Sequence, residues 1–66
     1  MSESPLDAAT RHVAEAERCW DRQIDLIATL AGQSEARTAA EQVLLEIQQT
    51  LRLARAQRAL IRALDV

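Results

Sequence analysis

The chain has 66 residues, which is enough for one small domain but too few to bury a large hydrophobic core unaided. Domains of this size usually need disulfides, a metal ion or a partner subunit. One cysteine, Cys19, excludes an intrachain disulfide, and one cysteine with one histidine, His12, argues against a structural metal site within a single chain. The formal net charge of −2 argues against a protein that coats nucleic acid or anionic lipid over its whole surface.

The composition predicts an all-α protein in the cytoplasm. Ala, Leu, Arg, Glu and Gln dominate and favour helices, whereas the chain has one Gly, one Pro and neither Phe nor Tyr. Residues 1–17 hold five charged side chains, unlike a secretory signal, and the longest uncharged stretch, residues 26–34, is too short to cross a bilayer. A lone cysteine is typical of a reducing compartment.

The first predicted helix covers about residues 5–31. Ser4 can cap its start, Pro5 suits the first helical position, and Asp7 stands where a capping acid is expected. Apolar residues then recur at steps of three and four, which is helical spacing: Leu6, Ala9, Val13, Ala16, Trp20, Ile24, Ile27 and Leu30. Charged residues occupy the opposite side, so the helix is amphipathic.

The turn is predicted at about residues 32–36. Gly32 adopts without strain the left-handed conformation that often follows a helix. Two caps are available for the next helix, either Ser34 directly or Thr38 in a capping box with Glu41. The sequence leaves this choice open.

The second predicted helix covers about residues 37–64, and its apolar surface is unusually wide. One stripe contains Ala40, Val43, Leu44, Ile47, Leu51, Ala54, Ile61 and Leu64. Leu53 and Leu60 open a second flank beside this stripe, so the apolar arc covers about half of the helix surface. One neighbouring helix cannot cover such an arc.

A short connection makes the two helices antiparallel neighbours, each about 40 Å long. We therefore expect one coiled-coil-like helical-hairpin domain, residues 1–66, that dimerises into a four-helix bundle; a trimer, a higher assembly or an unknown protein partner is the alternative. The residues expected in the core or in the interface between copies are Val13, Trp20, Ile24, Ile27, Leu30, Val43, Leu44, Ile47, Leu51, Leu53, Leu60, Ile61 and Leu64.

The stretch 50–64 carries four arginines and no acidic residue: Arg52, Arg55, Arg58 and Arg62. Antiparallel folding pairs residues whose numbers sum to roughly 67, which places these arginines beside the early acidic residues Glu3, Asp7, Glu15 and Glu17. Cations also interact favourably with a helix C-terminus. We interpret the arginines as charge-balanced within the bundle, with Arg55, Arg58 and Arg62 as possible partner-binding residues. The absence of Lys and of interleaved aromatic residues argues against nucleic acid.

Few residues suggest catalysis or metal binding. His12 and Cys19 lie on one flank two turns apart, and two copies could combine them into a zinc site, but a boundary histidine and a buried free cysteine are the preferred interpretation. Trp20 is assigned to the core or a dimer contact. Gln23, Gln57 and Thr50 interrupt apolar stripes, either to fix register or at a solvated rim.

The sequence lacks the patterns of an enzyme. It has no Ser-His-acid arrangement and no glycine-rich phosphate loop, and the carboxylates of Asp21 and Asp25 project from an exposed face. A small-molecule enzyme would need a pocket between subunits. We therefore predict no catalytic residue, no metal and no cofactor.

The segment RHVAEAER, residues 11–18, resembles the opening of a set of short uncharacterised bacterial proteins. Their pattern reads HVAEGERR, QxxLI, a Gly-His-Asp-Thr turn, ALL, TLxL and HR, and it matches here over about residues 11–62 without gaps. This chain has Ala16 in place of a glycine, Ser34-Glu35-Ala36 in place of Gly-His-Asp, and Gln57 in place of a histidine. The resemblance implies a helical hairpin and no known activity. If the histidines of the pattern have a role in those proteins, this chain is expected to lack it.

Together these features predict a non-enzymatic structural or protein-interaction module that associates with itself. The alternative is a small nucleic-acid-associated regulator that uses the arginine-bearing half of the second helix. The two hypotheses differ in the surroundings of Arg55, Arg58 and Arg62. The interaction module needs these arginines near acidic residues, whereas the nucleic-acid regulator needs them gathered into a basic stripe that no acidic residue neutralises. No membrane association is expected.

Overall fold

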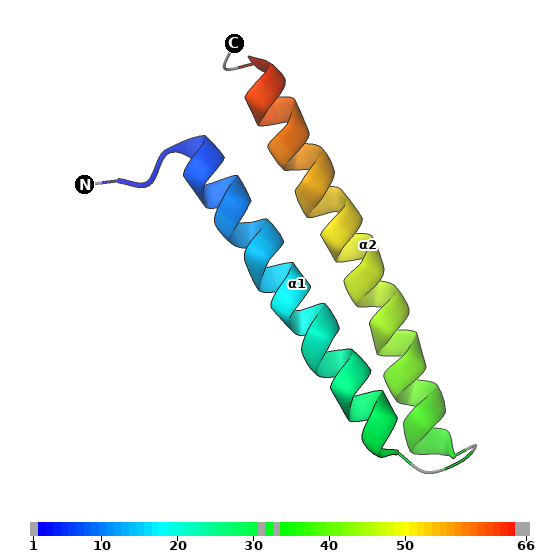
Figure 1. The fold of residues 1–66 in the computed structure, drawn as a ribbon. Coiled ribbons are helices and arrows are strands. Elements are labelled where there is room, and N and C mark those ends of the chain that lie inside the picture. Colours follow the sequence, from blue (N-terminus) through cyan, green and yellow to red (C-terminus); the bar gives the residue numbers. More distant parts are fainter. Residues whose placement is uncertain (1, 31, 33, 65–66) are drawn as a thin grey trace.

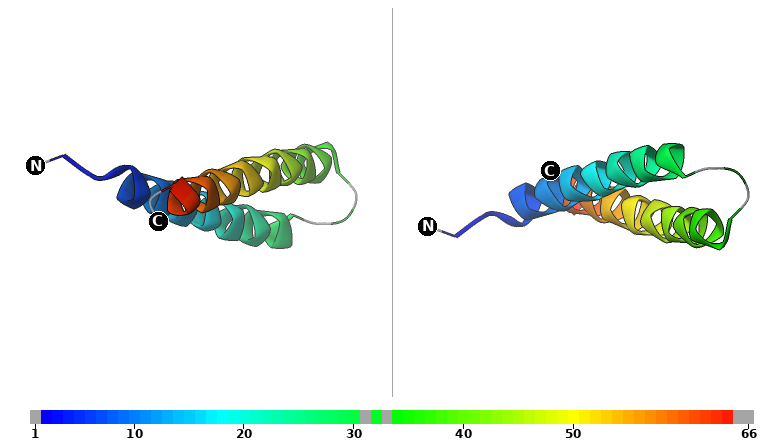
Figure 2. Two further views of the ribbon diagram at one scale, coloured as in Figure 1. Left: turned by 90° about the horizontal axis from the view of Figure 1, so that it is seen from above. Right: turned by 90° about the horizontal axis from the view of Figure 1, so that it is seen from below.

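The computed structural model describes residues 2–30, 32 and 34–64. Two helices, α1 (Pro5–Thr29) and α2 (Glu35–Leu64), run antiparallel and pack along their length, with the described ends of the chain at the same end of the hairpin (Figure 1). The two helices cross at a shallow angle, as Figure 2 shows from above and below. This architecture confirms the prediction of an all-α chain of two mutually packed helices. The molecule is an elongated slab of 49 × 21 × 13 Å.

The start of α1 is built by Ser4 and Pro5. Ser4 is extended, with φ −69° and ψ 157°, and its Oγ accepts a hydrogen bond of 3.1 Å from the backbone N–H of Asp7. Pro5 occupies the first turn, where the missing N–H leaves no bond unmade. The serine thus satisfies one of the free donors that every helix start presents.

The end of α1 lies two residues before the predicted end. Leu30 leaves the helical conformation, with φ −88° and ψ 128°, while its N–H donates to the carbonyl of Ile27 at 3.1 Å. Thr29 contributes, because its Oγ1 donates to the carbonyl of Leu26 at 2.6 Å and competes with the backbone for that acceptor. Ala31, the predicted last residue, lies outside the described residues.

Ser34 caps α2, and this decides between the two caps that the sequence allowed. Its Oγ accepts from the N–H of Arg37 at 3.1 Å, and its carbonyl accepts from the N–H of Thr38 at 3.0 Å. The helix therefore begins at Glu35, two residues before the predicted start, and Thr38 lies inside it. Gly32 has φ +56°, the left-handed value that a side chain would disfavour. Gln33, part of the predicted turn, is outside the described residues.

The seam between the helices is narrow because small residues line it. The buried side chains are Ala9, Val13, Ala16, Ala40 and Leu51. Val13 is 1% exposed and packs with Ala16, Leu51 and the half-buried Ala54. On α2 the buried and half-buried positions, apart from Gln48, recur at steps of three and four from Arg37 to Ile61, the seven-residue repeat of coiled-coil packing.

The large predicted core residues divide into three groups in a single hairpin. Val13 and Leu51 are buried. Those that are half-buried are Trp20, Ile27, Leu30, Leu44, Ile47 and Ile61. Those that are exposed are Ile24, Val43, Leu53, Leu60 and Leu64. One hairpin thus leaves the five large apolar side chains of the third group in water, and their assignment to an interface between copies stays a prediction.

Ser34→Ala should lower the free energy of unfolding by about 1 kcal/mol, because an N-cap hydroxyl is lost. Thr38→Ala is the matched control and should change it by less than about 0.5 kcal/mol, because Thr38 is exposed inside the helix. Urea denaturation at one fixed protein concentration measures both. Equal effects of the two substitutions would contradict the assignment of the cap.

Candidate interaction surfaces

Two grooves lie between the helices in the middle part of the hairpin, one on each side of the seam. We name them by their linings. The polar groove is lined by Glu17, Trp20, Asp21, Gln48, Leu51, Arg52 and Arg55. The apolar groove is lined by His12, Glu15, Ala16, Cys19, Thr50, Leu53, Ala54 and Gln57. Both are open troughs, so each is suited to contact with another surface better than to enclosing a small molecule.

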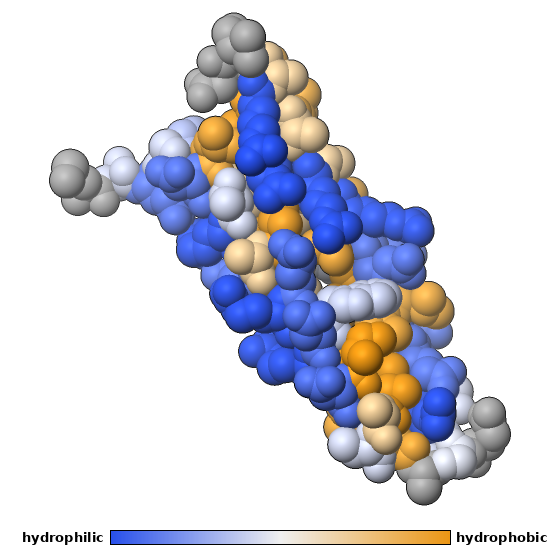
Figure 3. Space-filling view, in the orientation of Figure 1, coloured by the Kyte–Doolittle hydropathy of each residue, from blue (hydrophilic) through white to orange (hydrophobic). Residues whose placement is uncertain are grey.

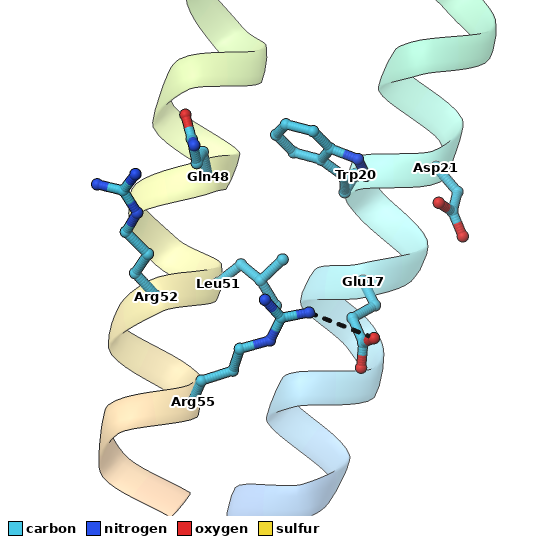
Figure 4. Close-up of a pocket in the computed structure, with 7 residues that line it drawn as sticks. All are labelled: Glu17, Trp20, Asp21, Gln48, Leu51, Arg52 and Arg55. Carbon is cyan, nitrogen blue, oxygen red and sulfur yellow. Dashed lines mark ion pairs between the residues drawn. The ribbon is translucent and has the colours of Figure 1, made fainter.

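The polar groove combines an aromatic ring with balanced charges (Figure 4). The Trp20 ring extends from α1 toward Gln48 of α2, beside Leu51. Arg55 reaches across, and its Nη2 lies 3.7 Å from Oε2 of Glu17. Both partners are about half exposed, so water screens this ion pair and its contribution to stability is at most about 1 kcal/mol.

The arginines of α2 meet the acids of α1 at one point among the described residues. Arg55 pairs with Glu17, whereas Arg58 is half-buried in the seam and Arg52 points outward from the polar groove. The early acids Glu3, which precedes α1, and Glu15, which lies within it, instead bind Arg11 of α1. The predicted proximity of the α2 arginines to the α1 acids is therefore found in one ion pair, Arg55 with Glu17.

Arg11 is a residue that sequence reasoning missed. Its Nη2 lies 3.0 Å from Oε1 of Glu3, and its Nη1 lies 3.0 Å from Oε1 of Glu15. The hydrogen bond from Arg11 lowers the pKa of Glu3 below its ordinary value and raises that of the guanidinium. The spacing of Arg11 and Glu15, four residues apart on a helix, was the available signal. The contact from Glu3 depends on how the segment before the helix folds back.

α2 carries a second, mostly apolar stripe that lies beside the seam on the side of the apolar groove. This outer stripe comprises Ala36, Ala39, Val43, Glu46, Thr50, Leu53, Gln57, Leu60 and Leu64. Its members recur at steps of three and four, and at 100° per residue its centre lies about 110° from the centre of the seam. Leu53 is 72% exposed and Leu64 is 77% exposed. The outer stripe holds one charged residue, Glu46, and none of the arginines.

The space-filling view shows that hydrophobic surface extends beyond the seam. On the face seen in Figure 3, hydrophilic side chains cover the middle of the hairpin, and hydrophobic side chains gather between the helices toward the connecting end. Seven large hydrophobic side chains in the described part of the chain are exposed: Ile24, Leu26, Val43, Leu45, Leu53, Leu60 and Leu64. A surface of this kind is typical of proteins that bind another protein.

His12 and Cys19 both line the apolar groove, as their seven-residue spacing predicts. Cys19 is half-buried, and Arg22 Nη2 donates to its Sγ at 3.2 Å. Within residues 2–30, 32 and 34–64, no three His, Cys, Asp or Glu side chains are placed to hold a metal ion. Nor does either described helix have the length and apolarity needed to cross a membrane.

The polar residues that interrupt the stripes have different positions. Gln23 lies in the seam, and its Nε2 donates to the carbonyl of Ala40 at 2.8 Å, so it ties the two helices together in one register. Gln57 is exposed at the rim of the apolar groove. Thr50 is exposed there too, and its Oγ1 donates to the carbonyl of Glu46 at 3.1 Å.

No protein-family model matches the chain, and neither a curated protein nor a solved structure gives a match. The resemblance of residues 11–62 to short bacterial hairpin proteins therefore stays a prediction. The function must be argued from the surfaces of the hairpin themselves.

Trp20→Ala should lower the free energy of unfolding by about 2–4 kcal/mol, because it removes the largest side chain of the seam. Arg52→Ala is the matched control in the same groove and should change it by less than about 0.5 kcal/mol, because Arg52 is exposed. Urea denaturation followed by circular dichroism suits both variants, since it does not use tryptophan fluorescence. A Trp20 variant as stable as the control would show that the ring does not hold the helices together.

Proposed function

We propose that this chain is a non-enzymatic protein-interaction module that associates with itself through its apolar helix faces. The observation that carries the proposal is the exposed area of one hairpin. The chain exposes 5098 Å². A folded monomeric protein of the same mass, 7.3 kDa, exposes about 4,200 Å².

The excess matches the size of a protein interface. It amounts to about 900 Å² per chain, and a stable interface of standard size buries about 800 Å² on each partner. A slab two helices wide and one helix thick has no interior, because each helix touches only one other. Docking a second slab onto the first gives every helix two neighbours, which is the arrangement of a four-helix bundle.

The buried residues support the same proposal. Five side chains are buried in the described hairpin, and three of them are alanines, each of which contributes little apolar area. Stability of a few kcal/mol is difficult to obtain from such a seam, because ordering each residue costs roughly 1–2 kcal/mol of conformational entropy. Burial of the exposed leucines between copies supplies the missing area.

The arrangement of charges does not favour the nucleic-acid alternative. Glu17 and Asp21 stand with Arg52 and Arg55 in the polar groove, so the groove holds as many acids as arginines. The outer stripe, which includes the exposed Leu53, Leu60 and Leu64, contains no basic residue. The cytoplasmic location expected from the lone cysteine stays a prediction.

Light scattering coupled to size-exclusion chromatography tests the proposal. At about 100 μM the protein should have twice the mass of its 7.3 kDa chain, and dilution should reduce the measured mass. Leu53→Glu is the disruptive variant and should give the mass of one chain. A folded wild-type protein with the mass of one chain at this concentration would refute self-association.

A further inference from the structure

We propose that the second copy occupies the apolar groove, and that the two hairpins pack face to face with their connecting ends at opposite ends of the bundle. This inference rests on the proposed self-association and specifies its surface and geometry. In this arrangement α2 packs antiparallel on α2 of the second copy, and α1 packs antiparallel on α1 of the second copy.

The side of the hairpin is identified by the exposed hydrophobic residues. Residues seven apart share a helix flank, so each exposed residue can be placed by a groove residue two turns away. Leu26 lies seven residues after Cys19, and Val43 lies seven residues before Thr50. Leu60 lies seven residues after Leu53, and Leu64 lies seven residues after Gln57. The four reference residues line the apolar groove: Cys19, Thr50, Leu53 and Gln57. Only Ile24 and Leu45 of the seven fall on the polar side, two turns from Glu17 and Arg52.

Charge favours the same side. Taking a charged side chain out of water is costly unless it finds a partner, so an interface forms most readily where few charges lie. Of the charged residues of α2 between 36 and 64, only Glu46 belongs to the outer stripe, and the rest lie at or beyond the seam. A copy docked on the apolar groove therefore leaves Arg52, Arg55 and Arg62 in solvent.

The outer stripe also has the length of a helix of this protein. It runs from Ala36 to Leu64, which spans about 42 Å at 1.5 Å per residue. Covering it needs an apolar helix of the same length, and α2, with 30 residues, is such a helix. The stripe is self-complementary, because an antiparallel copy can place Val43 against Leu60 and Thr50 against Leu53 of the second copy.

The orientation is decided by two charged residues of α1. Glu15 lines the apolar groove. Arg22 lies seven residues after Glu15, so it is on the same flank of α1, and it contacts Cys19 there. With the connecting ends apart, the two-fold symmetry brings Glu15 of each copy close to Arg22 of the other. With the connecting ends together, α1 would face α2 of the second copy, and Glu15 would lie against the apolar Leu53 with no partner beyond Arg11 of its own helix.

Disulfide trapping tests this geometry in the full chain. All variants carry Cys19→Ala, which removes the only native thiol. Proteins with V43C and with L60C are mixed, unfolded, refolded together and oxidised, and the products are identified by mass spectrometry. The mixed disulfide should dominate, because the two V43C positions would lie about 25 Å apart in the proposed dimer.

Each outcome bears on a different claim. Equal amounts of mixed and like disulfides, or only like ones, would overturn the antiparallel arrangement of α2. A dimer by light scattering that gives no mixed disulfide would overturn the proposed surface while the proposed function survives. A protein with the mass of one chain would remove both. Leu53→Glu and Leu45→Glu provide a second comparison, since the first should lower the dimer affinity at least tenfold and the second less than threefold; similar losses would overturn the choice of side.

Discussion

The constraint on which this structure depends is that a helix with one neighbour can cover only part of its surface. In α1 the apolar positions mostly fit a single seam, and the small residues Ala9 and Ala16 let α2 approach closely. In α2 they do not fit, because a second stripe lies beside the seam. The hairpin thus buries apolar residues along its seam and leaves others exposed on one side. The proposed dimer follows from that mismatch.

The same constraint explains the arginine-rich stretch. The leucines of residues 50–64 lie on the outer stripe or in the seam, and the arginines occupy the seam edge and the polar side. Arg55 contacts Glu17 across the groove, and Arg58 is half-buried between the helices. In the proposed dimer, this separation of charged from apolar surface on one helix leaves the arginine-bearing side in solvent and the other side in the interface.

Sequence reasoning found the elements of the fold because they depend on local patterns. Ser4, Pro5 and Gly32 each have one conformational role that no tertiary contact overrides. The choice between Ser34 and Thr38 as a cap was not decidable, because both fit the local pattern and the connection selects one. The hydrogen bond from Gln23 to Ala40 was also not predictable, since it depends on the register between the two helices. The contact between Glu3 and Arg11 depends on how the segment before α1 folds back, which no local pattern specifies.

In the proposed dimer each hairpin completes its apolar core with a second copy, so folding and association should be coupled. The most direct measurement is the midpoint of thermal unfolding as a function of protein concentration. Coupled folding predicts that the midpoint rises steadily between about 1 and 500 μM, because mass action favours the folded dimer. A cooperative transition whose midpoint stays constant over that range would mean that one hairpin is stable alone, and would contradict the account.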